Sequence, residues 1–278
     1  MNSTIKTLAI ALAMGLSAAG VFAAATASDT AANYTSTWGT SPPNLGSGFG
    51  AWDIQTLNNT SPPYVGTYLD LASYGNADGA LSPSGSGGAA WGTYANGGSG
   101  NGEFIMTRPF TAGPSGSTSL YNQTFSIGIG SGGVGGTGSS ISLNVGTAFG
   151  LSYVGGGSDN MLLSVDGGTA TAVPVNFADL GAGLLVSLAV SGPLSSTSEG
   201  YALTISPFAG GSPIYSTSGT FNSAVYNTSS FTFDDLNTSA NGYVNNPSIT
   251  PESVPEPTSM VMLGFAGLAS LLAIRRRK

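Results

Sequence analysis

Apolar and polar positions alternate along short runs of this chain, and most such runs lie between residues 28 and 250. In residues 103–110, Phe104, Met106 and Phe110 share one face with Arg108. Other runs with one apolar face are residues 125–129, 141–145, 149–153, 161–165, 184–190, 201–205, 230–233 and 243–249. A period of two residues is typical of strands with one buried face, and no long segment has a helical period.

These runs predict about a dozen strands with no crossover helices between them, which favours antiparallel pairing. We therefore predict an all-β fold, an antiparallel β-sandwich or jelly roll, in a single domain at residues 28–250. Gly-rich stretches at residues 84–88, 97–102 and 128–138 suit bulges and exposed turns.

The composition excludes several kinds of chemistry. The 278 residues include no Cys and no His, which excludes disulfides, thiol nucleophiles, Ser-His-Asp triads and nearly all zinc sites. Between Ser28 and Pro257 there are 13 acidic side chains and one basic side chain, Arg108, a net charge of −12. This charge repels polyphosphate and argues against a nucleic-acid partner.

The N-terminus has the three parts of a secretory signal. Lys6 is followed by the apolar run 8–16, and residues 21–23 or 25–27 offer a small-residue cleavage pattern. We predict a signal helix within a signal peptide at residues 1–27, recognised by the Sec export machinery and by signal peptidase. The mature chain should then begin near Ala24 or Ser28.

The C-terminus, residues 251–278, combines a proline motif, an uncharged apolar run at 260–274 and a terminal basic cluster. The motif is Val254, Pro255, Glu256 and Pro257, and the cluster is Arg275, Arg276, Arg277 and Lys278. The basic cluster acts as a stop-transfer signal and keeps the tail on the cytoplasmic side. As a membrane helix the run would span only about 22 Å, short of the roughly 30 Å core, which suits transient better than permanent anchoring.

This C-terminal arrangement resembles the PEP-CTERM sorting signal of Gram-negative bacteria. The resemblance implies that Pro255, Glu256 and Pro257 are recognised by an exosortase, a membrane protease, and that the tail from Met260 onward is removed. It implies export across the inner membrane, transient anchoring, and final residence at the cell surface or outside the cell. Proteins with this signal are commonly associated with extracellular polysaccharide, which is therefore an expected partner. A permanent tail anchor is the alternative.

The domain itself more loosely resembles concanavalin-like lectin sandwiches. The resemblance lies in four short sequence segments: Trp91-Gly92-Thr93-Tyr94-Ala95-Asn96, Arg108-Pro109-Phe110, Gln123-Thr124-Phe125-Ser126-Ile127 and Tyr243-Val244-Asn245-Asn246-Pro247-Ser248-Ile249. It implies a fold more than an activity.

Without His or Cys, the hydrolytic mechanism left to this chain is that of a two-carboxylate glycosidase. Glu103 is the candidate, but charged residues are rarely buried, so a solvated carboxylate at a strand edge is the simpler interpretation. Hard oxygen ligands for calcium occur in turn regions at Asp234, Asp235 and Asn237, and at Asn76 and Asp78. None matches a complete calcium loop, so solvated Asx turns are the simpler interpretation of these residues. The three Trp residues are candidates either for stacking on sugars or for the core.

We therefore expect an exported surface or matrix protein with a structural or adhesive role and no enzymatic activity. Carbohydrate binding is one form that this role can take. No cofactor is expected, with calcium as the candidate ion. The alternative is a glycoside hydrolase or lyase acting on polysaccharide. An enzyme would need two carboxylates about 5 to 9.5 Å apart, whereas a binding module needs only an exposed aromatic or Asp/Asn cluster.

Overall fold

The computed structural model describes residues 27–34, 38–58, 65–71, 81, 89–95, 102–110, 121–129, 134, 136–157, 159–191, 198–225, 228–238 and 241–251. All of them lie in one compact unit, Ala25–Val254. The predicted signal helix and C-terminal membrane helix lie outside the described residues. Within the described ranges, no helix is both long enough and apolar enough to cross a bilayer.

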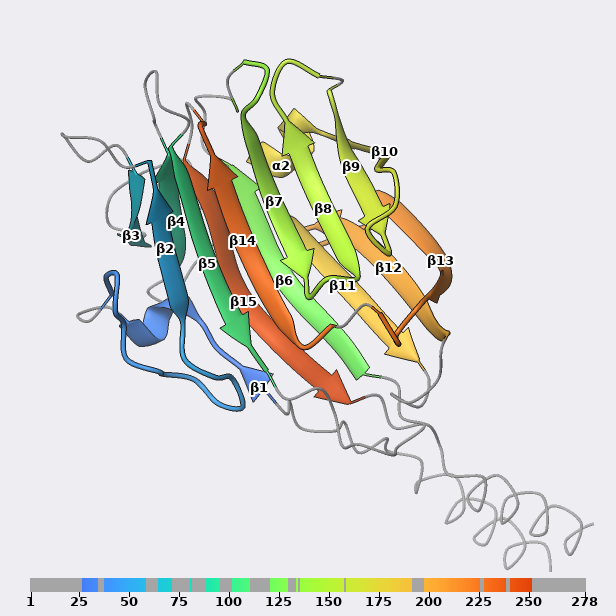
Figure 1. Cartoon of the computed structure of the whole chain (residues 1–278), viewed down its shortest axis with the longest axis horizontal. Coiled ribbons are helices and arrows are strands. Elements are labelled where there is room, and N and C mark those ends of the chain that lie inside the picture. Colours follow the sequence, from blue (N-terminus) through green and yellow to red (C-terminus); the bar gives the residue numbers. More distant parts are fainter. Residues whose placement is uncertain are drawn as a thin grey trace, which may run out of the picture. The chain divides into compact units, whose positions relative to one another are not determined.

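Nearly all regular structure in the described part of the chain is β-strand (Figure 1). The strands are β1 (Ala27–Ser28), β2 (Asp53–Leu57), β3 (Val65–Leu71), β4 (Ala89–Ala95), β5 (Glu103–Pro109), β6 (Tyr121–Ile129), β7 (Ser140–Val145), β8 (Phe149–Val154), β9 (Asn160–Val165), β10 (Thr171–Asn176), β11 (Leu184–Ser191), β12 (Glu199–Pro207), β13 (Tyr215–Phe221), β14 (Ser230–Leu236) and β15 (Gly242–Pro251). The helices are the 3-10 turn η1 (Ala31–Tyr34) and α2 (Phe177–Gly181).

The strands form two sheets in two layers (Figure 1). The eight-stranded sheet has the order β13-β12-β11-β6-β15-β4-β3, with β1 paired to β15. The seven-stranded sheet has the order β10-β9-β8-β7-β14-β5-β2. Each strand pair in the two sheets is antiparallel. The predicted antiparallel β-sandwich is confirmed.

The last two strands occupy central positions in their sheets. β15 lies between β6 and β4, and β14 lies between β7 and β5. Each sheet is therefore completed only by residues near the end of the domain.

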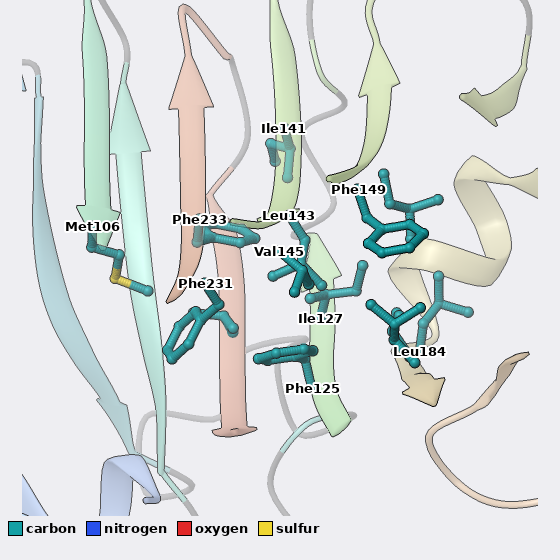
Figure 2. Packing of buried hydrophobic residues seen from close by; sticks show 14 of the residues in the cluster. Met106, Phe125, Ile127, Ile141, Leu143, Val145, Phe149, Leu184, Phe231 and Phe233 are labelled. Carbon is teal, nitrogen blue, oxygen red and sulfur yellow. The ribbon is translucent and has the colours of Figure 1, made fainter. Parts of the chain in front are cut away.

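The core lies between the sheets and follows the predicted alternation. In β5, Phe104, Met106 and Arg108 are buried, while Ile105 and Thr107 between them are partly exposed. The labelled side chains of β5, β14, β7 and β8 meet those of β6 and β11 across the interlayer space (Figure 2). Phe125 and Phe231, for example, lie with ring centroids 5.2 Å apart. Each such fully buried side chain contributes about 1.5–3 kcal/mol of transfer free energy.

Residues 27–34 and 38–50, the N-terminal strap, connect the two sheets. Ala27 pairs with Ile249 of β15 in one sheet, and Phe49 forms a bridge with Phe110 beyond β5 in the other. The strap buries Arg108, which forms an ion pair with Asp29 and donates a hydrogen bond to the Gly50 carbonyl. The one basic side chain of the domain thus holds its N-terminal segment in place.

Candidate functional site

Three tyrosines gather on the outer side of the eight-stranded sheet, the side away from the main core, and we call Tyr68, Tyr94 and Tyr243 the tyrosine face. Their orientation follows from strand alternation, since Thr67 of β3 points inward, where its hydroxyl accepts a hydrogen bond from Trp38. Tyr68 must therefore point outward. Tyr94 and Tyr243 lie on the same side, because the register pairs Gly92 with both Tyr68 and Tyr243 and pairs Gly66 with Tyr94.

Two glycines make room for these rings. A Cβ atom on Gly92 would lie 2.5 Å from Cζ of Tyr68, and a Cβ atom on Gly66 would lie 2.5 Å from the Tyr94 hydroxyl. Each ring therefore lies across the glycine opposite to it on the neighbouring strand. The Tyr68 and Tyr94 rings have centroids 6.3 Å apart at an interplanar angle of 37°.

Tyr243 anchors this arrangement. Its hydroxyl lies 2.6 Å from the Tyr68 hydroxyl, and its side chain is buried in a small cluster with Leu81 and Ala90 that is separate from the main core. Tyr68 and Tyr94 themselves are partly exposed. The face is therefore held from one side and accessible on part of its surface.

Asp70 continues the same face of β3, two residues beyond Tyr68 and opposite Ala90. Its side chain is only 6% exposed, and its Oδ1 atom has no hydrogen-bond partner among the residues that the structure describes. A buried polar atom normally has a partner, because desolvation without one costs free energy. Next to Tyr68, the carboxylate can accept a hydrogen bond from a bound hydroxyl group, while the aromatic rings can contact an apolar ring face.

The predicted calcium ligands Asp234 and Asp235 point to opposite faces of the seven-stranded sheet. Asp235 is fully buried opposite Phe104, and it accepts hydrogen bonds from Thr93 at 2.8 Å and Thr238 at 2.5 Å. Asp234 is on the outer face, opposite Ile105. Successive strand residues cannot share one ligand sphere on one face, so the arrangement separates these two carboxylates.

The other predicted ligands do not complete the set. Asn237 has a left-handed backbone with φ of 50°, and its main chain bonds to Gly102 and to the Ser139 hydroxyl. Asn76 and Asp78 lie outside the described residues. Within the described ranges there is no group of three or more acidic, His or Cys side chains arranged to hold a metal. Calcium binding stays a prediction.

Glu103 lies on the outer face beside Asp234, as a diagonal neighbour on β5. We call Glu103, Asp234 and Asp235 the acid cluster. Burial first, then Glu103 and Asp235, raise the pKa of Asp234 to about 7. Burial raises the pKa of Asp235 to about 6, against hydrogen bonds from Thr238 and Thr93 that lower it. Asp234 is therefore partly protonated near neutral pH, and within the described ranges its Oδ1 atom has no partner.

The tryptophans belong to the core and not to the surface. Trp91 is fully buried, Trp52 is 9% exposed, and Trp38 packs partly buried against them. The Trp52 and Trp91 rings make an edge contact at 5.0 Å. Of the two sequence interpretations, the structure supports packing over sugar stacking for these residues.

Sequence reasoning did not single out Tyr68, Asp70 or the pairing of Tyr94 with Gly66. A signal for them exists in the spacing, since Gly66, Tyr68 and Asp70 alternate on one strand and Gly92 and Tyr94 on the next. The sorting-motif residues Val254 to Pro257 and the basic residues Arg275 to Lys278 lie outside the described residues.

Comparison with known families identifies a PEP-CTERM protein-sorting motif at residues 253–278. This confirms the resemblance seen at the C-terminus, and the motif implies an exported protein that is processed by an exosortase and sorted to the surface or outside the cell. No curated protein sequence matches this chain.

Three of the solved structures to which this chain is similar are the following. A lectin from Bauhinia forficata in complex with GalNAc is 9% identical, with a TM-score of 0.35, covering 73% of this chain and 99% of the lectin. Arcelin-5, a lectin-like defense protein from Phaseolus vulgaris, is 8% identical, with a TM-score of 0.37, covering 72% and 98%. The binding domain of botulinum neurotoxin serotype D is 9% identical, with a TM-score of 0.39, covering 75% and 50%.

The chain thus spans about half the length of the binding domains it matches, 43% in the case of one receptor binding domain. At such low sequence identity, the ligand or binding site of one protein cannot be assigned to the other.

Proposed function

We propose that this protein is an adhesive binding module of the cell surface or extracellular matrix, without catalytic activity, whose ligand is polysaccharide. The sorting motif supports the location. The observation that carries the binding role is the tyrosine face, with two rings laid over glycines beside an unpartnered carboxylate.

Ligand sites typically combine aromatic surface with a few fixed polar groups, and the tyrosine face has both. Rings that lie along a sheet present a flat apolar surface to a ligand. Sugar rings have an apolar face of C–H groups and an edge of hydroxyl groups, so they match this combination.

The charge of the domain narrows the class of polysaccharide. With 13 acidic side chains and only Arg108 between Ser28 and Pro257, the domain repels polyanions such as uronic-acid polymers. An uncharged glycan is therefore the expected ligand.

A glycan array probed with the exported protein, with and without calcium, tests the binding role. We expect signal on uncharged glycans and none on carboxylated or sulfated glycans. Absence of binding to every glycan would reject the adhesive role in this form.

The processing route has its own test. Replacing Pro255, Glu256 and Pro257 together by Ala should leave the domain folded but retained in the membrane, because these residues form the expected recognition motif. Intact-mass analysis of released wild-type protein should show loss of both ends. A released mass that still includes Arg275 to Lys278 would contradict exosortase processing.

One observation favours a second candidate, a polysaccharide hydrolase. Asp234 and Glu103 are diagonal neighbours, about 7–8 Å apart by strand geometry, and the pKa of Asp234 is raised to about 7, as in a general acid. A reducing-end assay on neutral polysaccharides distinguishes the two functions. Hydrolysis that disappears in both Glu103→Gln and Asp234→Asn would establish the enzyme and overturn the non-catalytic role.

A further inference from the structure

We infer that Asp70, Tyr68 and Tyr94 form one subsite for an uncharged segment of a polysaccharide, in which Asp70 accepts a hydroxyl hydrogen bond that fixes one sugar ring and the tyrosine rings contact the segment beside it. This inference rests on the proposed polysaccharide binding. It adds which residues hold the ligand and what charge the ligand has.

The positions of the three residues follow from the register. Asp70 and Tyr68 lie on the same face of β3, with Cα atoms about 6.6 Å apart at two residues of strand rise. Tyr94 lies on β4, opposite Gly66, and its ring is tilted by 37° to that of Tyr68. A carboxylate thus stands at one end of a row of two aromatic rings.

The rings are fixed before any ligand arrives. Tyr68 is held through its hydroxyl by Tyr243, which is 3% exposed, and it lies over Gly92. One face of each ring is directed at the glycine backbone, so the partial exposure of Tyr68 and Tyr94 belongs to the remaining surface. Rings that are already oriented lose little conformational entropy on binding.

Asp70 is the polar part of the subsite. Its Oδ1 atom is buried and unpartnered beside the small apolar cluster that contains Ala90. On folding, this oxygen loses its hydration without gaining a hydrogen bond, which costs free energy. A ligand hydroxyl can offset that cost by donating a hydrogen bond to it. A carboxylate accepts such a bond more strongly than a neutral group does.

The sign of the charge selects the ligand. A carboxylate or sulfate group on the sugar would face Asp70 in a domain whose residues 28–250 contain 11 acidic side chains and one basic side chain, so anionic polysaccharides are excluded by repulsion. An uncharged ring has hydroxyl donors without that repulsion.

The structure suggests variants that separate binding from folding. Asp70→Asn removes the charge and one acceptor oxygen while keeping the shape, and it should not lower stability because the buried Oδ1 atom has no partner to lose. Tyr94→Ala removes one ring. The matched controls are Asp53→Asn, an exposed carboxylate on β2 of the other sheet, and Tyr215→Ala, a partly exposed tyrosine on β13 at the far edge of the same sheet.

Affinity electrophoresis of the exported protein in gels containing laminarin, mannan or galactan measures binding, with alginate as the anionic probe and chitosan as the amine-bearing probe. We expect wild type to be retarded by at least one neutral polymer and not by alginate. Asp70→Asn should weaken that binding about tenfold or more, and Tyr94→Ala about two- to tenfold. Both controls should bind as wild type does, and Asp70→Asn should melt at or above the wild-type temperature.

The outcomes separate the two proposals. Binding to a neutral polymer that survives unchanged in both Asp70→Asn and Tyr94→Ala overturns the subsite and leaves polysaccharide binding intact. Retardation by alginate or chitosan alone overturns the assignment to an uncharged ring. Failure of wild type on every polymer overturns polysaccharide binding itself.

Discussion

Two buried acidic regions of this domain differ in how their carboxylates are stabilised: one is paired with a cation and the other is not. At the N-terminal strap, Asp29 forms an ion pair with Arg108 and accepts hydrogen bonds from the Tyr34 hydroxyl at 2.6 Å and the Asn33 amide at 2.8 Å. In the acid cluster, Asp235 is buried just as deeply, but its donors are neutral: the Thr93 and Thr238 hydroxyls and the Gly242 backbone. Asp234 is next to it in the chain.

The difference shows that the single basic side chain of the domain neutralises only one of its two buried acidic regions. Arg108 donates to carbonyl and amide oxygens of the strap, and its guanidinium lies 5.0 Å from the Phe49 ring centroid and 4.8 Å from that of Trp52. Burial lowers the pKa of Arg108 to about 10, which leaves it charged at neutral pH. The acid cluster has no such cation, and burial raises the pKa values of Asp234 and Asp235 instead.

The largest effect should come from removing the cation. Arg108→Met leaves Asp29 buried without its counter-charge, which should lower the free energy of unfolding by about 3–5 kcal/mol, measured by urea denaturation. The double variant Asp29→Asn with Arg108→Met should recover part of this loss, because the buried charge is then gone. Losses that simply add in the double variant would show that the two groups are not coupled.

A smaller loss is expected at the acid cluster. Asp235→Ala removes the acceptor for the Thr93 and Thr238 hydroxyls, which should lower the free energy of unfolding by about 1–3 kcal/mol. The same urea titration compares it directly with Arg108→Met. If Asp235→Ala lowers the free energy of unfolding more than Arg108→Met does, the contrast between the region with a cation and the region without one is wrong.

The pH dependence of stability should report the acid cluster. Because the pKa values of Asp235 and Asp234 rise from 3.8 to about 6 and about 7 in the folded chain, folded protein binds more protons than unfolded protein between these values. Their stabilising contribution is fully present below about pH 4 and is lost as the pH rises through 6 and 7. Thermal melts should therefore show a falling midpoint between about pH 5 and pH 8.

The variant Asp234→Asn should flatten this decline. Burial also raises the pKa of Glu199, whose contribution has the same sign and stays in the variant. An identical pH profile in wild type and Asp234→Asn would remove Asp234 as its source.

The smallest expected effect is that of calcium. Millimolar calcium should raise the melting temperature by a few degrees more than sodium at equal ionic strength, since bound ions stabilise only the folded chain. If the ion is held on the outer face, Asp234→Asn should abolish the difference and Asp53→Asn should not. Superimposable melts in calcium, sodium and chelator would reject the metal site.

The strands could be predicted because burial in a sandwich follows a period of two, and residues such as Phe125, Ile127 and Ile129 keep that period. The same rule already implies that Asp234 and Asp235 point apart, although side by side they read as a pair of metal ligands. Tyr68 and Tyr94 escaped prediction because their surface depends on which strands become neighbours, and the pairing of Gly66 with Tyr94 joins segments 28 residues apart. The burial of Arg108 depends on a strap whose path the sequence pattern does not encode.

The strand β15 is central in its sheet and also lies next to the sorting motif in the chain. The strand that fills the gap between β6 and β4 ends at Pro251, two residues before the matched sorting motif begins at residue 253. A chain that ends before β15 therefore lacks both a central strand of its eight-stranded sheet and the sorting motif. Because the motif follows β15 in the chain, every copy that carries the motif after an uninterrupted sequence also carries the residues of both central strands, β14 and β15.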